Sequence, residues 1–440
     1  MIQNNNVDVN YKINKRYNTA KYPIRQPLFF TWLIWVLSKM MLIGKKRKVE
    51  RVNMDGLKAP YIMLSNHMSF IDFELTAEGT YPQRMNNVVN IDGYYMRPWL
   101  MEWIGSIATR KFTMDLHLIK SIRKVLSRGD VLCMYPEARY SPCGINSYIP
   151  ESVGMLVKKN RVPVVAVLHR GNYLHKPFWN FRKARKVPLH TTITQILTKE
   201  DVERLSVSEI NDRIKEALTY DDYAYQKENG ILITEPYRAE GLHKVLYQCP
   251  HCHTEYKMAS EGAEIFCKEC GKHWTLNEDG TLSANDGVTE FSHVPDWFNW
   301  EREQVTAQVE NGEYSISDEV DVFSQPRCYS FIPLGKAKLT HDPENGFILQ
   351  GHYNGKDYYI HRAPLQSNSL HVEYDWQHVR PEDCIDISTE NDSFYCYFTS
   401  YDNIVTKMAF ATEAIYLKSL REKRPDSKDV KDSIKNAASC

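Results

Sequence analysis

The chain has 440 residues, with 55 Lys or Arg and 55 Asp or Glu, so its formal net charge is zero at pH 7. This length exceeds one ordinary hydrophobic core, and two or three domains are expected. The balanced charge argues against a general polyanion binder. The first 60 residues are nevertheless far richer in Lys and Arg than in Asp and Glu, which points to an anionic membrane surface as a partner of that part of the chain.

Residues 28–43 form an apolar, aromatic-rich run that Lys39 interrupts, and the basic stretch 45–48 follows it. The run is short for a membrane span, which needs about 20 apolar residues. A helix with Trp on its apolar side and flanking cations is typical of segments that lie in the membrane interface. We therefore interpret residues 1–50 as a basic and apolar membrane-interface segment, with a true span or a buried core helix as alternatives. Because residues 1–18 are polar, no secretory signal is expected.

Residues 51–240 alternate between strand and helix patterns. The spacing of apolar residues predicts a helix between Thr113 and Gly129, and Ser206 with Glu209 predicts the start of another by a capping box. We therefore expect an α/β domain whose mixed sheet is flanked by helices and whose site lies at the strand ends. Strands are predicted near residues 60–65, 130–135, 162–168 and 190–196.

The first predicted strand leads directly to a histidine and, five residues later, to a carboxylate, His67 and Asp72. A neutral imidazole at position 67 can take a proton from a hydroxyl near pH 7. An ionised Asp72 can hold the tautomer of the ring and stabilise the imidazolium that forms. In a chain with 15 His this spacing should also arise about once by chance, so the motif needs support from other segments.

Two further segments place charged groups after predicted strands or turns. Glu137 and Arg139 follow the strand 130–135 and a proline, while Arg110 and Lys111 are adjacent cations that follow a glycine. A simpler interpretation exists for each pair. Glu137 and Arg139 can form a local ion pair that fixes the loop, and the two adjacent cations can belong to a solvated face.

Taken in this order, the segments resemble the glycerolipid acyltransferase family, whose lysophosphatidate acyltransferases carry the block Asn-His-x-Ser-x-x-Asp. The resemblance covers roughly residues 30–220 and includes a proline-containing apolar block at 162–167. The third block departs from the family pattern, because Ala138 replaces a glycine and Arg139 stands one place earlier than the family arginine. In the second block the family spacing puts the cation at Lys111. The first block is matched completely, by Asn66, His67, Ser69 and Asp72.

In that family the histidine activates an acceptor hydroxyl, which attacks the thioester of acyl-CoA or acyl-carrier protein without an acyl-enzyme. The resemblance therefore implies that His67 is the general base, that Asp72 orients it and that Glu137 organises the neighbouring loop. It also implies cations that hold an acceptor phosphate, namely Arg110 or Lys111 together with Arg139.

The resemblance thus predicts an O-acyltransferase that acts on a hydroxyl of a glycerol phosphate or a lysophosphatidate-like lipid. We expect such a protein to be cytoplasmic and peripheral on the inner face of the membrane, with acyl-carrier protein as a possible partner. Two alternatives stay open. One is acylation of a non-phosphorylated lipid or glycolipid hydroxyl, and the other is a catalytically idle lipid-binding scaffold.

Two Cys-x2-Cys pairs lie 14 residues apart in the segment that follows. Four thiolates suit tetrahedral zinc, and a closed set of four leaves no open position for water, so a structural zinc ribbon is predicted at residues 241–284. A redox pair or disulfides are the alternatives. Nucleic-acid binding is not expected, because acidic residues offset the lysines of this segment. The four cysteines are Cys249, Cys252, Cys267 and Cys270.

Residues 285–422 are predicted to form a β-rich domain that ends in a helix near 411–421. Short apolar or alternating runs separated by Asn, Asp, Gly and Pro are typical of strands. A pleckstrin-homology-like sandwich and an unspecified β-sandwich both explain the pattern. The charged residues 423–440 are predicted to be a disordered tail. The clearest runs lie at residues 346–350, 357–361 and 394–398.

Overall fold

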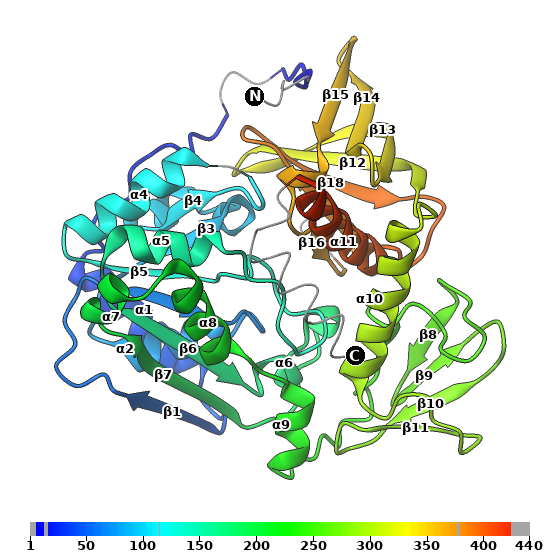
Figure 1. Cartoon of the computed structure of the whole chain (residues 1–440), viewed down its shortest axis with the longest axis horizontal. Helices are drawn as coiled ribbons and strands as arrows, with labels where there is room; N and C mark the ends of the chain where they lie inside the picture. Colours follow the sequence, from blue (N-terminus) through cyan, green and yellow to red (C-terminus); the bar gives the residue numbers. More distant parts are fainter. Residues whose placement is uncertain (1–5, 13–15, 114, 376–378, 424–440) are drawn as a thin grey trace.

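The structure is a computed structural model of the chain, and it describes residues 6–12, 16–113, 115–375 and 379–423. Figure 1 shows three parts: an α/β layer on the left, a small sheet at the lower right and a larger β-rich part at the upper right. Most of the predicted tail, residues 424–440, lies outside the described residues.

The α/β part is built on one mixed sheet of seven strands in the order β1-β7-β6-β2-β5-β3-β4. The five strands from β6 to β4 run parallel to one another, whereas β7 is antiparallel to β6 and β1 is parallel to β7. A mixed sheet with flanking helices is thus confirmed. The strands are β1 Arg47–Val52, β2 Ile62–Ser65, β3 Met85–Asn90, β4 Ile107–Thr109, β5 Val131–Met134, β6 Val164–Arg170 and β7 Leu189–Leu197.

The central strands of this sheet are buried on both faces, which explains why their sequences are almost continuously apolar. On one face Ile62 and Leu64 pack against helices α4, α5 and α8. On the other face Met63 belongs to a separate cluster, and α2 approaches so closely that a Cβ added at Gly79 would lie 2.5 Å from Ile193. The parallel strands carry their carboxyl ends to one edge, where the loops that follow them gather.

Two helices of this part were predicted from the sequence, and both are present. The capping box at the start of α8 is present, since Ser206 accepts from the backbone N–H of Glu209 and Glu209 accepts from that of Ser206. Asp115, rather than Thr113, caps α4. The helices are α1 Leu28–Met41, α2 Asp72–Thr80, η1 Ile91–Tyr94, α3 Pro98–Trp103, α4 Leu116–Ser127, α5 Ser152–Asn160, α6 Asn172–His175, η2 Phe178–Asn180, α7 Lys199–Arg204, α8 Val207–Leu218 and α9 Asp222–Glu228.

Helix α1 buries polar side chains and exposes apolar ones, the reverse of the usual arrangement in a helix on the surface of a water-soluble protein. It packs against α2 and buries Thr31 and Ser38, whereas many of its large apolar side chains are exposed. Aromatic rings continue this outer surface from α1 to α3, with Phe30 and Trp103 centred 6.0 Å apart. Within the described part of the chain, no helix has the length and apolar character needed to cross a membrane. The exposed apolar residues of α1 and the turn after it are Leu28, Phe29, Trp32, Leu37, Met40, Met41 and Ile43.

The cysteine-containing part is a four-stranded antiparallel sheet in the order β11-β10-β9-β8. It is preceded by the short helix η3 Leu242–Lys244 and is followed by the long helix α10 Val294–Glu310. Helix α10 was not predicted from the sequence. The strands are β8 Met258–Glu261, β9 Glu264–Cys267, β10 His273–Leu276 and β11 Leu282–Ala284.

The C-terminal part confirms the predicted β-rich region that ends in a helix. Its seven strands form one continuous antiparallel sheet in the order β15-β14-β13-β12-β18-β17-β16, and α11 packs against α10. The resemblance to a pleckstrin-homology domain stays a prediction. The elements are β12 Ile316–Arg327, β13 Ser330–Asp342, β14 Gly346–Tyr353, β15 Lys356–Arg362, η4 Pro364–Gln366, β16 His371–Glu373, β17 Cys384–Ser388, β18 Ser393–Phe398 and α11 Val405–Lys423.

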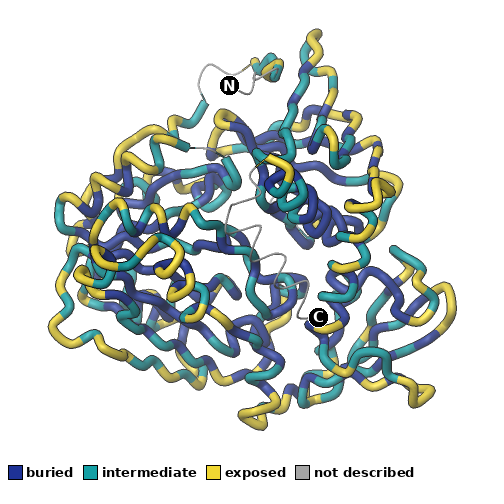
Figure 2. Tube along the Cα trace, in the orientation of Figure 1, coloured by how far each residue is buried: buried dark blue, intermediate teal, exposed yellow. Residues whose placement is uncertain are grey.

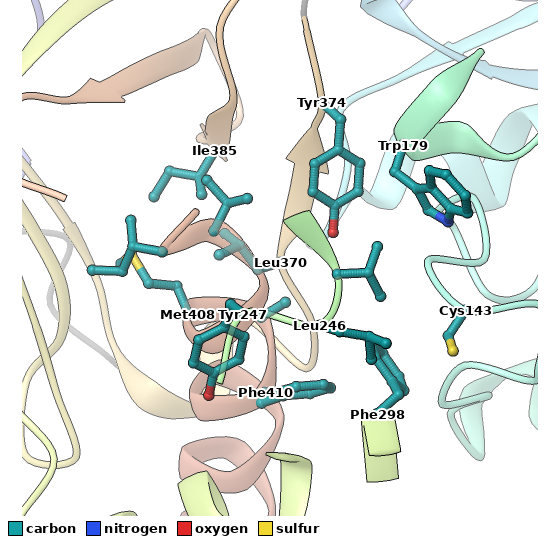
Figure 3. Packing of buried hydrophobic residues seen from close by; sticks show 14 of the residues in the cluster. Cys143, Trp179, Leu246, Tyr247, Phe298, Leu370, Tyr374, Ile385, Met408 and Phe410 are labelled. Carbon is teal, nitrogen blue, oxygen red and sulfur yellow. The ribbon is translucent and has the colours of Figure 1, made fainter. Parts of the chain in front are cut away.

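The three parts share their largest hydrophobic cluster, so they pack as one body along a common seam. Figure 3 shows side chains of this cluster from all sides of the seam, with Trp179 of the α/β part, Tyr374 of the β-rich part, and Phe298 of α10 beside Phe410 of α11. Figure 2 shows buried chain along both sides of this seam. The N-terminal segment also crosses parts, because Val7 forms a β-bridge with Tyr359 of β15.

Candidate active site and cysteine cluster

His67 and Asp72 form a hydrogen-bonded pair in the loop between β2 and α2. The His67 Nδ1 atom donates to Asp72 Oδ2 at 3.1 Å, which leaves Nε2 as the ring atom that can exchange a proton with a substrate. The His67 side chain keeps 18% of its surface exposed, while that of Asp72 keeps 1%. The pair therefore has one accessible end and one buried end, as a general base and its orienting carboxylate require.

The Asp72 carboxylate is held by donors from two segments besides His67. Its Oδ2 accepts from the backbone N–H groups of Met68 at 2.7 Å and Ser69 at 3.0 Å, and its Oδ1 accepts from the Asn172 side chain at 2.7 Å. Burial by itself raises the pKa of Asp72, but the hydrogen bonds and the nearby histidines outweigh burial, so the pKa lies below its ordinary value. Asp72 is therefore ionised at neutral pH.

The His67 ring is enclosed by two tyrosines from the loop after β5. The Tyr135 ring stacks on it with centroids 3.9 Å apart, and the Tyr140 ring lies 3.8 Å away on a tilt of 33°. Burial lowers the pKa of His67, and although the hydrogen bond with Asp72 raises it, the net pKa stays below the ordinary value. The ring is thus neutral near pH 7, which is the form that can accept a proton.

The loop after β5 turns at Ala138, and the turn decides where Arg139 points. Ala138 has a φ of +56°, and its N–H donates to Tyr135 O. Glu137 is buried and accepts from the backbone N–H of Ser147 at 2.8 Å, and burial raises its pKa to about 7. Arg139 donates to the Ser147 hydroxyl at 3.2 Å. The two loop residues thus share Ser147 as a partner, and the ion pair of Arg139 is with Glu413 of α11 rather than with Glu137.

Arg110 and Lys111, the adjacent cations after β4, contact different groups. Arg110 is buried and donates to the Gln325 carbonyl at 3.4 Å and to the Ser393 hydroxyl at 3.0 Å, both in the β-rich part. Arg110 therefore does not belong to a solvated face, which was the alternative interpretation of this residue. Lys111 contacts the ring of His371 on β16 and lies close enough for its charge to lower the pKa of His67.

Arg110, Lys111 and Arg139, the three cations predicted to hold an acceptor phosphate, therefore all contact residues of the C-terminal half of the chain. The partners that sequence reasoning missed are His371, Ser393 and Glu413. They stand 260, 283 and 274 residues from Lys111, Arg110 and Arg139, respectively. No local spacing can indicate pairs separated by such distances along the chain.

A small cavity lies in the seam beside this loop. Its volume of about 20 Å³ has room for roughly one water molecule, far less than an acyl chain needs. Apart from Arg139 its walls are mainly apolar or aromatic. An acyl chain that entered here would have to separate the α/β part from the β-rich part. The lining includes Arg139, Tyr140, Phe178, Phe298, Leu370 and Phe410.

The four predicted cysteines come together at one end of the small sheet. Their sulfur atoms lie within 4.8 Å of one another, with Cys249 Sγ to Cys270 Sγ at 3.8 Å and Cys252 Sγ to Cys267 Sγ at 3.7 Å. Zinc–sulfur bonds of about 2.3 Å in a tetrahedron give sulfur separations of about 3.8 Å. None of the four is paired in a disulfide. The donor set and its spacing thus fit a metal ion such as zinc.

No family model matches the chain, and no curated protein matches it significantly. Among solved structures, a similar one is the 1-acyl-sn-glycerophosphate (LPA) acyltransferase PlsC from Thermotoga maritima, with a TM-score of 0.35 and 16% sequence identity. The match covers 43% of this chain and 78% of that chain. A likeness at this level is too weak to define an activity, so we infer the activity from the side chains of the site.

The neutral state of His67 can be tested by NMR on protein labelled with [13C]histidine, using His67→Gln to assign the signal. We expect His67 to titrate below its ordinary value of about 6.5 because its ring is enclosed. Tyr140→Ala should admit water to one face of the ring and raise the pKa toward 6.5. The exposed Tyr329→Ala should leave it unchanged, and titration of the wild-type ring at or above 6.5 would contradict this description.

The metal site can be tested by the metal content and stability of cysteine variants. Cys267→Ser should remove one zinc ion per chain and lower the melting temperature, because a structural zinc site supplies folding free energy on the order of 10 kcal/mol in small zinc domains. Cys328→Ala, which lies outside the cluster, is the matched control and should keep its zinc. A Cys267→Ser protein with unchanged zinc content would rule out this ligand set.

Proposed function

We propose that this protein is an O-acyltransferase that moves a fatty acyl group from a thioester to a lipid hydroxyl. The observation that carries the proposal is the His67–Asp72 pair, with Nδ1 bound to a buried, ionised carboxylate and Nε2 available on a neutral ring. The same pair argues against an idle scaffold, because a protein that only binds lipid has no need for a carboxylate anchored by so many donors.

The reaction proceeds by direct transfer. His67 Nε2 takes the proton of the acceptor hydroxyl as its oxygen attacks the thioester carbonyl carbon. The tetrahedral intermediate collapses with loss of the thiolate, which receives the proton from the imidazolium. Asp72 stabilises that imidazolium while it exists. Acyl-CoA and acyl-carrier protein both supply such a thioester, and either is compatible with this chemistry.

The acceptor proposed first is a glycerol phosphate or lysophosphatidate-like lipid. Arg139 and Lys111 lie on the two loops beside His67, and a guanidinium binds a phosphate through paired hydrogen bonds. For Arg139 to do so, the phosphate must replace the Glu413 carboxylate. Arg110 is proposed as a positioning residue rather than a phosphate ligand, since it is buried against the β-rich part.

A second acceptor class is favoured by the same contacts. Arg139 is already neutralised by Glu413 and Lys111 already contacts His371. A non-phosphorylated lipid or glycolipid hydroxyl carries no charge that competes with Glu413 for Arg139 or with His371 for Lys111. The two classes differ only in whether the cations contact the acceptor, so they can be separated by substitution.

We further propose that the protein works as a peripheral protein on an anionic membrane surface, at the inner face of the membrane. The outward apolar side chains of α1 and the aromatic rings of α3 support this proposal, because such a surface is stabilised by insertion at the headgroup level. The basic residues 45–48 border it and suit anionic headgroups.

The role of His67 is tested by incubating purified protein with labelled acyl-CoA or acyl-carrier protein and a total lipid extract, followed by mass spectrometry of the product. His67→Ala should lower turnover by about 10² to 10⁴-fold, the usual contribution of a general base, with an unchanged circular dichroism spectrum. The exposed His352→Ala is the control and should behave as wild type. Turnover of His67→Ala at the wild-type rate would exclude the proposed mechanism.

The acceptor is tested with two lipids that share one acyl chain, lysophosphatidate and monoacylglycerol. Replacing both members of the Arg139–Glu413 pair by Met removes the two charges together, so that neither is left without the other. If Arg139 binds phosphate, the double variant should raise the KM for lysophosphatidate about tenfold or more, since hydrogen bonds to charged groups contribute about 1.5–3 kcal/mol. The KM for monoacylglycerol should not change.

The matched control replaces the exposed pair Lys336 and Glu319 by Met. If wild-type protein acylates only monoacylglycerol, the second acceptor class replaces the first. If it acylates lysophosphatidate and the double variant has an unchanged KM for that lipid, Arg139 does not bind the phosphate.

A further inference from the structure

A second cluster of potential metal ligands lies in the seam, apart from the cysteines. It joins Asp92 of η1 in the α/β part to His371 and Glu373 of β16 in the β-rich part. One ligand atom from each residue lies within 4.8 Å of the others. His371 and Glu373 are two residues apart on a strand, so their side chains project from the same face. Both are buried, whereas Asp92 is partly exposed.

The two nitrogens of His371 face different carboxylates. Its Nε2 lies 3.3 Å from Glu373 Oε1, and its Nδ1 lies 3.6 Å from Asp386 Oδ2 on the neighbouring strand. Metal-bound histidines commonly direct their second nitrogen at a carboxylate, which fixes the tautomer. The arrangement matches that pattern, with Nε2 on the ligand side and Asp386 behind the ring.

Two buried atoms of this cluster lack hydrogen-bond partners among the described residues. They are His371 Nδ1 and Asp386 Oδ2, which face each other but lie too far apart for a hydrogen bond. Leaving such atoms unsatisfied is unfavourable in a protein interior. A cation bound at Nε2 would polarise the ring and strengthen its Nδ1–H as a donor to Asp386, which would draw the two atoms together.

The charges around the cluster also call for a cation. Asp92, Glu373 and Asp386 supply three carboxyl groups, and those of Glu373 and Asp386 are buried. The Lys111 ammonium contacts His371 Nε2, so it already places a positive charge where an ion would bind. The ammonium carries one positive charge, whereas a divalent ion carries two and binds imidazole and carboxylate ligands directly.

We propose that Asp92, His371 and Glu373 bind a divalent transition-metal ion, with Asp386 as the hydrogen-bond acceptor of His371. One imidazole and two carboxylates suit ions such as Mn²⁺, Fe²⁺ and Zn²⁺. The ion would connect the α/β part to the β-rich part and displace Lys111 from His371. The proposal stands on this cluster and does not depend on acyl transfer.

Mn²⁺ is the probe of choice, because an oxygen-rich site binds it while the zinc-loaded cysteine cluster does not. Full-length protein with zinc left in place is titrated with Mn²⁺, and free Mn²⁺ is followed by electron paramagnetic resonance. The wild type should bind one Mn²⁺ per chain. Glu373→Gln and Asp92→Asn should each weaken binding at least tenfold, whereas the exposed Glu344→Gln should not.

Two further variants test whether the ion replaces Lys111 and whether its site is independent of His67. Lys111→Met should bind Mn²⁺ as tightly as wild type or more tightly, because a competing cation is removed; weaker binding would make Lys111 a necessary part of the site and overturn the proposed exchange. His67→Ala should bind Mn²⁺ normally even if it abolishes acyl transfer. Because Asp92 is partly exposed and comes from the other side of the seam, its variant keeps the test valid if Glu373→Gln fails to fold.

The proposal fails if the wild type binds neither Mn²⁺ nor a second Zn²⁺ beyond the one in the cysteine cluster. It also fails if the folded Asp92→Asn variant binds Mn²⁺ as tightly as Glu344→Gln. A Mn²⁺-dependent rise in melting temperature in the wild type, absent from Asp92→Asn, would support a bridge between the two parts.

Discussion

The geometry of the candidate site depends on one buried carboxylate. Asp72 is the first residue of α2 and accepts four hydrogen bonds, from two backbone N–H groups, from Asn172 and from His67. An ionised group at this depth is stable only when its oxygens are well satisfied. The loop after β2 therefore has little freedom, and the orientation of His67 follows from it, with Nδ1 committed and Nε2 free for chemistry.

A second constraint acts across the seam. The loops at the ends of β4 and β5 carry Arg110, Lys111 and Arg139, and each of these cations is matched by a group from the C-terminal half. Removing one partner from a buried charged pair is strongly destabilising. The β-rich part therefore forms one side of the candidate site. The lipid acceptor proposed above would have to replace these partners or separate the two parts.

The elements that rely on short-range signals could be predicted from the sequence. The His67–Asp72 spacing, the Cys-x2-Cys pairs and the capping box at Ser206 all act within a few residues. The direction of Arg139 could not, because it depends on the left-handed backbone of Ala138. Helix α10 was missed for a different reason. The buried face of α10 includes Glu301, whose side chain accepts from the backbone N–H of Gln248. A Glu among the buried positions interrupts the regular spacing of apolar residues by which a helix is predicted.

The cysteine part is tied to the site through α11. Lys407 of α11 pairs with Glu255 beside the cysteines, and Trp297 of α10 donates to the Gln248 carbonyl at 2.9 Å. The same helix α11 carries Glu413, which pairs with Arg139 in the loop after β5. A metal ion held by the cysteines would therefore act on the site without touching it. By fixing the fold on which α10 and α11 rest, it would fix the position of the Glu413 carboxylate that pairs with Arg139.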